Sequence, residues 1–144
     1  MASGKKISFD SELASHIFLN ASISGIGDSL GLRGSSVNGS LYLALFSSSP
    51  TDSAVGTEMS YSNYARVSVP RTGSFWAVSG IDVTNRERII FPACGGASGI
   101  AVAFAICKGQ AVGVDDAIFY NILERQVQIT PQSSPVFAIG QFSI

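Results

Sequence analysis

From residue 41 onward, short apolar runs alternate with polar turn signals. The runs at residues 41–46 and 100–107 are apolar at consecutive positions, which predicts strands covered on both faces. The other runs lie between proline, glycine and asparagine residues, at 64–69, 75–78, 81–84, 88–91, 117–123, 127–129 and 136–144. About eight or nine short strands at this spacing are typical of an all-β fold, and we expect an antiparallel β-sandwich.

Three of these runs supply the expected core. We expect the strands at 41–46, 100–107 and 117–123 to lie inside the sandwich, because they are the most apolar segments of the chain. The side chains expected to be mostly buried are Leu41, Leu43, Leu45, Val102, Phe104, Ile106, Ile118, Tyr120 and Ile122.

The N-terminal part has a helical pattern instead. Asp10 is a residue type that caps helix N-termini. Leu13, Ile17 and Ala21 follow it at helical spacing. The pattern therefore predicts one amphipathic helix over residues 10–22.

Glycine and serine dominate the next segment, residues 22–40, which predicts an irregular arm. We accordingly divide the chain into a helix and arm over residues 1–38 and a β-sandwich domain over residues 39–144. Ordering glycine costs backbone entropy, so we expect the arm to be mobile in the free protein and ordered on a partner.

The composition limits the classes of partner. Charged residues are 13% of the chain, about half the average of globular proteins, and hydrophobic residues are 46%. This composition excludes intrinsic disorder. Nine basic against ten acidic residues give a net charge of −1, so we expect no nucleic-acid partner. A surface with so few charges favours self-association, and we expect a homo-oligomer, with a trimer as the favoured state.

The apolar segments are too short to act in a membrane. The longest, residues 100–107, has eight residues, whereas a membrane-spanning helix needs about 20. Lys5 and Lys6 are followed by no apolar segment of the kind found in signal peptides. We expect a chain made in a cytoplasm, without a membrane partner.

Candidate catalytic and metal-binding residues are few. His16 is the only histidine and lies on the predicted helix, and the only cysteines are Cys94 and Cys107. Two separated cysteines favour buried thiols, although their spacing leaves a disulfide open. The adjacent acids Asp115 and Asp116 fit a turn before a strand. We therefore expect no enzyme activity, no cofactor, no metal site and no catalytic residue.

Aromatic and arginine side chains gather in one part of the sequence. Such residues dominate protein interfaces, but they also form cores and platforms that stack on sugars, and all three alternatives stay open here. The candidate interface residues are Tyr61, Tyr64, Arg66, Arg71, Phe75 and Trp76.

Several sequence strings occur together in a recognisable order. They are GSLYLALFSSSPTD at residues 39–52, Gly56-Thr57-Glu58, Tyr64-Ala65-Arg66, Trp76, Phe91-Pro92-Ala93 and the late Phe119-Tyr120 strand. This order resembles a group of small all-β bacteriophage virion structural proteins, described as tail-fibre, tail or minor structural proteins. The resemblance covers residues 38–144 and implies a virion component made in the host cytoplasm, without an active site.

Three functions are compatible with these observations. The first choice is a capsid decoration, or cement, protein that bridges capsomers, with itself and the major capsid protein as partners. The alternative is a tail, fibre or baseplate component. The third is a carbohydrate-binding module. We rank decoration first because the sequence contains no heptad or repeat that would build a fibre shaft.

Overall fold

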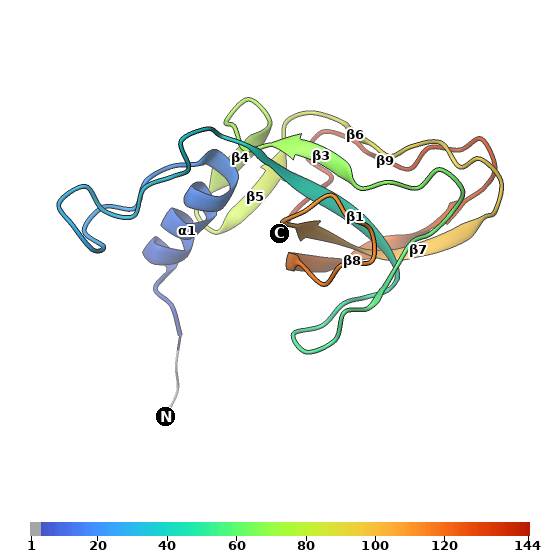
Figure 1. The fold of residues 1–144 in the computed structure, drawn as a ribbon, viewed down its shortest axis with the longest axis horizontal. Helices are drawn as coiled ribbons and strands as arrows, with labels where there is room; N and C mark the ends of the chain where they lie inside the picture. Colours follow the sequence, from blue (N-terminus) through green and yellow to red (C-terminus); the bar gives the residue numbers. More distant parts are fainter. Residues whose placement is uncertain (1–3) are drawn as a thin grey trace. The chain divides into compact units, whose positions relative to one another are not determined.

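The computed structural model describes residues 4–144, which form one helix and nine strands (Figure 1). In chain order the elements are α1 (Ile7–Leu19), β1 (Ser40–Ser48), β2 (Thr57–Glu58), β3 (Val67–Pro70), β4 (Trp76–Ser79), β5 (Asp82–Asn85), β6 (Ile89–Ile90), β7 (Gly99–Cys107), β8 (Ala117–Ile129) and β9 (Val136–Phe137). The strands pair antiparallel, so the predicted all-β class and the number of strands are confirmed.

The elements belong to two compact units that interleave along the chain. The first unit contains α1, the arm, residues 70–87 and residues 138–143. The second contains Leu41–Val69 and Arg88–Phe137. The domain boundary expected between residues 38 and 39 stays a prediction for the folding of the isolated segments.

The second unit is built on a five-stranded sheet. Its strand order is β2-β1-β7-β8, and β3 also pairs with β1. In the central pair, Leu43 lies opposite Ile106 and Leu45 opposite Phe104. All four side chains are buried, because side chains alternate between the two faces of a strand and these four share one face. The prediction that β1 and β7 are covered on both faces is confirmed.

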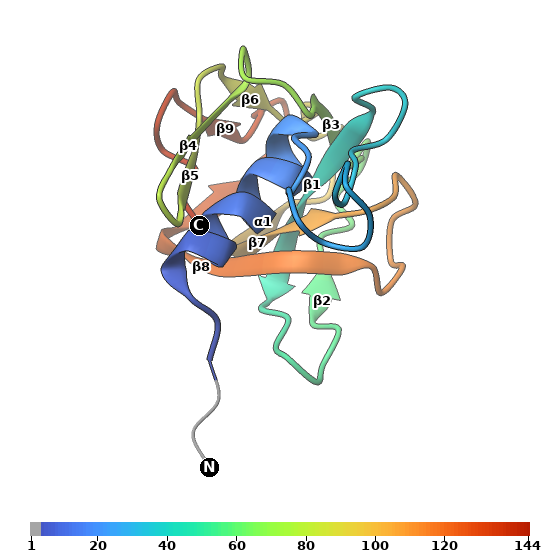
Figure 2. The same ribbon diagram turned by 90° about the vertical axis from the view of Figure 1, so that its left-hand side faces the viewer.

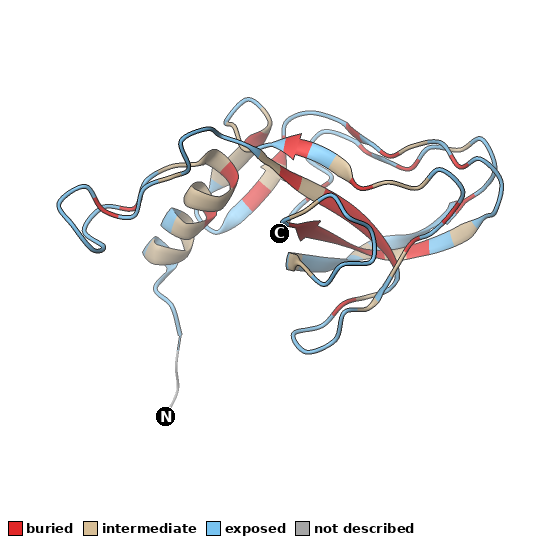
Figure 3. Ribbon diagram, viewed as in Figure 1, coloured by how far each residue is buried: buried red, intermediate tan, exposed pale blue. Residues whose placement is uncertain are grey.

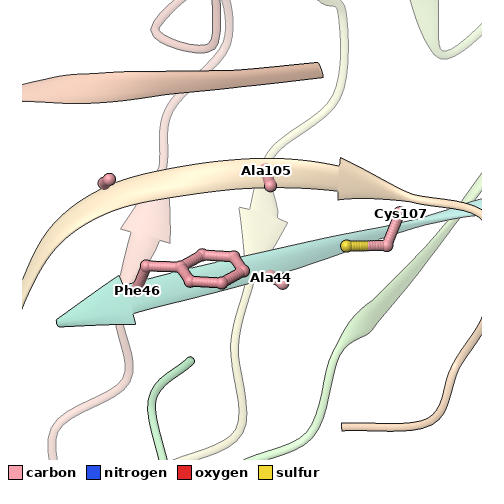
Figure 4. Packing of buried hydrophobic residues seen from close by; sticks show 5 residues of the cluster. Ala44, Phe46, Ala105 and Cys107 are labelled. Carbon is pink, nitrogen blue, oxygen red and sulfur yellow. The ribbon is translucent and has the colours of Figure 1, made fainter. Parts of the chain in front are cut away.

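The other face of the same pair carries small side chains. Ala44 lies opposite Ala105, and Phe46 lies opposite Ala103. With Cys107 they form a buried cluster in which the Phe46 ring is the largest group (Figure 4). Because each of these pairs contains an alanine, the side-chain layer on this face of the sheet is thin and closely packed.

A small two-stranded sheet covers the face of the β1–β7 pair that carries Leu43 and Leu45. Strands β6 and β9 pair through Ile89 and Phe137. The ring of Phe137 lies edge-on to that of Phe104 on β7, with 5.4 Å between ring centroids. Because β6–β9 packs on the larger sheet in this way, the second unit has two β layers, as expected for a sandwich.

The predicted burial of the 117–123 run is wrong. Ile118, Tyr120 and Ile122 are 37%, 39% and 67% exposed, and Val102 is only half-buried. The strand β8 is at the edge of the sheet and has β7 as its one partner there, so much of it faces solvent (Figure 3). An apolar run predicts a strand, but it does not reveal that strand's position in the sheet.

The first unit forms around Trp76. The hairpin of β4 and β5 lies beside α1 (Figure 2). The Trp76 side chain, on β4, is fully buried. Its ring meets those of Phe18, Phe75 and Phe142 edge-on, at centroid distances of 5.0, 5.0 and 5.3 Å. The predicted strand over 136–144 is reduced to Val136–Phe137, and Phe142, further along this segment, packs into the aromatic cluster instead.

The helix begins earlier than the sequence indicated. It spans Ile7–Leu19, and Lys6 occupies the N-cap position without a side-chain cap. Asp10 lies in the first turn and pairs with Lys5 at 2.9 Å, so the predicted cap at Asp10 is wrong. The buried helix residues are Ala14 and Phe18 rather than the predicted Leu13 and Ile17 stripe, which is half-buried.

The arm is irregular, as predicted, but local hydrogen bonds hold its shape. Ile23 and Leu32 exchange two backbone hydrogen bonds of 2.8 Å, and Asn20 bonds Ser35 through its side chain. Gly31 has a φ of +74°, and a Cβ there would lie 2.2 Å from the Ile23 carbonyl oxygen, so only glycine fits. The expected mobility of the arm in the free protein stays a prediction.

Candidate functional site

A buried ion network occupies one end of the large sheet. Arg66, just before β3, donates from Nε and Nη2 to the two carboxylate oxygens of Glu58 on β2, at 2.9 and 3.0 Å. Its Nη1 donates to Asp116, just before β8, at 2.7 Å. The side chain of Arg66 is 0% exposed, so the network lies inside the second unit.

The same network holds the loop between β7 and β8. Arg66 also donates to the carbonyl oxygens of Gly109 and Val114, at 2.8 and 2.9 Å. In return, the amides of Gly113 and Gly109 donate to Glu58 and Asp116, both at 2.6 Å. We call residues 109–115 the clamped loop, because its backbone groups bind these three buried side chains.

All five N–H groups of Arg66 are satisfied in this arrangement. Burial alone lowers the pKa of Arg66, but its hydrogen bonds with Glu58 and Asp116 outweigh burial and raise that pKa above its ordinary value. A buried cation with every donor paired is tolerated, whereas losing one partner would leave an uncompensated charge. The network therefore holds the backbone of the clamped loop by hydrogen bonds, while Val112 and Val114 remain exposed at its surface.

Two tyrosines complete the surroundings of the network. The Tyr64 hydroxyl donates to Glu58 at 3.0 Å and accepts from the Leu45 amide at 2.9 Å. The Tyr61 hydroxyl donates to the Pro92 carbonyl at 2.8 Å. Their rings meet edge-on at 5.1 Å, so both tyrosines serve the core of the second unit.

Three groups with raised pKa values are expected to make the fold sensitive to alkali. Burial raises the pKa of Cys107 from 9.0 to about 12 and that of Tyr61 from 10.0 to about 12, and it also raises the pKa of Tyr64. Each group is neutral when folded and ionises at lower pH when unfolded. Its contribution to stability is therefore complete below about pH 9 and is lost as the pH rises toward 12.

We expect the free energy of unfolding, measured in urea, to be level up to about pH 9 and to fall above it. Replacing Cys107 by alanine should delay the fall until about pH 10, where the tyrosines of the unfolded chain begin to ionise. An identical pH profile in the variant would contradict a buried, protonated thiol at position 107.

The other three candidate interface residues lie in the first unit. Arg71 donates from Nε and Nη2 to the carbonyl oxygens of Ile17 and His16, at 2.6 and 2.7 Å, and thereby caps the C-terminal end of α1. Phe75 is half-buried beside Trp76, whose side chain is fully buried. Arg71, Phe75 and Trp76 thus support the packing of α1.

The six candidate residues do not form a single cluster in either unit. Tyr61, Arg66 and Trp76 are buried, which agrees with the core-packing alternative for them. A role in an interface stays a prediction for all six residues. Tyr61 and Trp76 are buried, whereas Tyr64 and Phe75 are half-buried, and stacking of these aromatic residues on sugars stays a prediction.

Sequence reasoning missed two members of the network. The sequence pattern places Glu58 in the Gly56-Thr57-Glu58 string and Asp116 in a turn before a strand, and neither position indicates an ion pair. The rarity of charged residues could have indicated these acids. In a chain with 13% charged residues, an acid at the start of an apolar strand is a candidate for a buried ion pair. Their common partner, Arg66, is 8 and 50 residues away in the sequence.

The remaining candidates for chemistry have structural surroundings. Cys94 and Cys107 are both free and buried, which confirms the buried-thiol interpretation and closes the disulfide alternative. Nδ1 of His16 lies 2.6 Å from the Ala21 carbonyl oxygen. Within residues 4–144, no three His, Cys, Asp or Glu side chains gather where they could hold a metal ion. No helix in that part of the chain is long and apolar enough to cross a membrane.

Comparison with known proteins adds one informative match. No curated protein sequence matches the chain. A family described as podophage GP4 fiber I protein gp80 matches residues 31–144, which include every strand, the ion network and the clamped loop. This match confirms the resemblance to phage structural proteins at the level of the family. Because it spans well over half of the sequence, the chain belongs to the podophage GP4 fiber I protein gp80 family.

Proposed function

We propose that this protein is a fibre-type structural component of a podophage virion and that it acts at the tail. The family match over residues 31–144 is the observation that carries the proposal. It favours the tail, fibre or baseplate alternative over the capsid-decoration function, which the sequence pattern alone places first. The sequence has no heptad repeat that would build a shaft. It still fits a fibre component, because a β domain can form the head or adaptor of a fibre whose shaft is another chain.

The geometry of the second unit suits such a role. Recognition surfaces work best when their loops are ordered before binding, because less entropy is then lost in the complex. The clamped loop is ordered in this way by Arg66, Glu58 and Asp116, and it presents two exposed valines. The proposed partners are therefore neighbouring virion proteins at the tail and other copies of this chain.

Particle microscopy tests the location. A small tag at the N-terminus lies outside the family match, so gold labelling of tagged virions should leave the matched β region unchanged. We expect label at the tail and none on the head shell, with tagged major capsid protein as the control for head labelling. Label arranged over the capsomers would overturn the proposal in favour of decoration. A chain absent from purified particles would exclude both functions.

A further inference from the structure

The strand β8 has an open edge along the five-stranded sheet. It is 13 residues long, and in the described part of the chain β7 is its one strand partner. Edge strands carry backbone groups that can pair with a further strand. The amide of Ile122 already donates to the side-chain oxygen of its neighbour Asn121, at 2.8 Å, so this donor is occupied in the single chain.

A bulge of four residues lies in β8, in its pairing with β7. On β7, Ala101 pairs with Val127 and Ala103 pairs with Ile122. The four residues 123–126 of β8 therefore lie opposite Val102 alone. A bulge of this kind displaces the extra residues from the partner strand, so residues 123–126 have no register partner on β7.

The side chains around the bulge are exposed, and their order along β8 makes the strand complementary to the same strand of a second copy. Glu124 and Arg125 are exposed neighbours, and neither forms an ion pair with any of the described residues. On either side of them, Ile122 is 67% and Val127 is 38% exposed. Outward from the bond between Glu124 and Arg125, the first pair has opposite charges, the second is Leu123 with Gln126, and the third is the apolar pair Ile122 and Val127.

We propose that β8 pairs antiparallel with β8 of a second copy of this chain, about a twofold axis between Glu124 and Arg125. In this register each Glu124 faces Arg125 of the other copy, and each Ile122 faces Val127 of the other copy. Opposite charges and apolar pairs directly across antiparallel strands are both favourable. The twofold axis produces each contact twice.

The charges also select this register against its neighbours. A shift of one residue in one direction places Glu124 opposite Glu124 of the second copy, and a shift in the other direction places Arg125 opposite Arg125. Like charges directly opposite are destabilising. The ladder is short, so association is weak for the isolated protein and is strengthened where copies are held together. Twofold pairing yields a dimer rather than the trimer expected from composition.

The test is a charge swap in the full chain, followed by sedimentation equilibrium over two decades of protein concentration. The unmodified protein should form dimers. Glu124→Arg and Arg125→Glu should each weaken dimerisation by about tenfold, because each converts two attractive contacts into two repulsive ones. The double variant Glu124→Arg/Arg125→Glu should restore dimerisation to within about threefold, since it re-creates opposite charges across the axis.

A matched control is available in the other unit. Arg86 and Glu87 are also exposed, adjacent and opposite in charge, so Arg86→Glu and Glu87→Arg change the net charge equally. These variants should dimerise like the unmodified protein. Circular dichroism verifies folding, and protection of amides 123–126 from hydrogen exchange should increase with concentration in the unmodified chain.

A monomer at all concentrations, a trimer, or a double variant no tighter than the single variants would overturn the pairing. None of these outcomes depends on where the protein sits in the virion, so this test and the labelling test fail independently.

Discussion

Replacing Arg66 by methionine is expected to lower the free energy of unfolding by about 3–5 kcal/mol. The substitution keeps an apolar chain of similar length but leaves Glu58 and Asp116 buried without their cation. It also removes the donors that hold the carbonyl groups of Gly109 and Val114. Urea unfolding monitored by far-ultraviolet circular dichroism measures the loss.

Arg33 provides the control, because it pairs with Asp28 on the exposed surface. Arg33→Met should change stability by less than about 1 kcal/mol. Adding Glu58→Gln and Asp116→Asn to Arg66→Met should recover part of the loss, because the uncompensated charges are then gone. Equal effects of Arg66→Met and Arg33→Met would show that the network contributes no more than a surface pair.

Hydrogen exchange gives the same prediction a local readout. In the folded protein, the amides of Gly109 and Gly113 donate to buried carboxylates. In Arg66→Met these two amides should exchange faster, while the amides in the β1–β7 pair keep their protection. This pattern distinguishes release of the clamped loop from general loosening of the second unit.

Truncating Trp76 to alanine is the second large effect that we expect, with a loss of about 3–5 kcal/mol. The indole is fully buried among Phe18, Phe75 and Phe142, so its removal leaves a cavity between α1, β4 and the C-terminal segment. Thermal unfolding followed by circular dichroism measures the change. The half-buried neighbour Phe75 is the control, and Phe75→Ala should cost less than Trp76→Ala.

The substitution Trp76→Phe distinguishes the stability that comes from ring packing from any contribution of the indole N–H group. The indole Nε1 is buried and has no hydrogen-bond partner among the described residues. Phenylalanine therefore removes an unsatisfied donor and loses no hydrogen bond, so the cost should stay below about 2 kcal/mol. A cost as large as that of Trp76→Ala would mean that the indole N–H makes a stabilising contact.

Local pattern was sufficient for several features of this protein. The consecutive apolar residues of β1 and β7 predicted two strands covered on both faces, and these strands are paired at the centre of the sheet. Glycine and serine predicted the irregular arm, and separated cysteines predicted buried thiols. These features depend on period, turn chemistry and hydrophobicity, which are properties of a few neighbouring residues.

The candidate site depended on contacts that no local pattern encodes. The sequence alone determined that the chain is all-β, poor in charge and built from about nine short strands, although it did not indicate β2 and it divided β8 into two runs. Only the tertiary structure decided that β8 lies at an edge, that Arg66 joins Glu58 to Asp116, and that Phe142 returns to Trp76. The physical reason is that strand order and the pairing of distant side chains are set by which surfaces the whole chain can bury together, and residues 50 or more positions apart leave no periodic signal of their meeting.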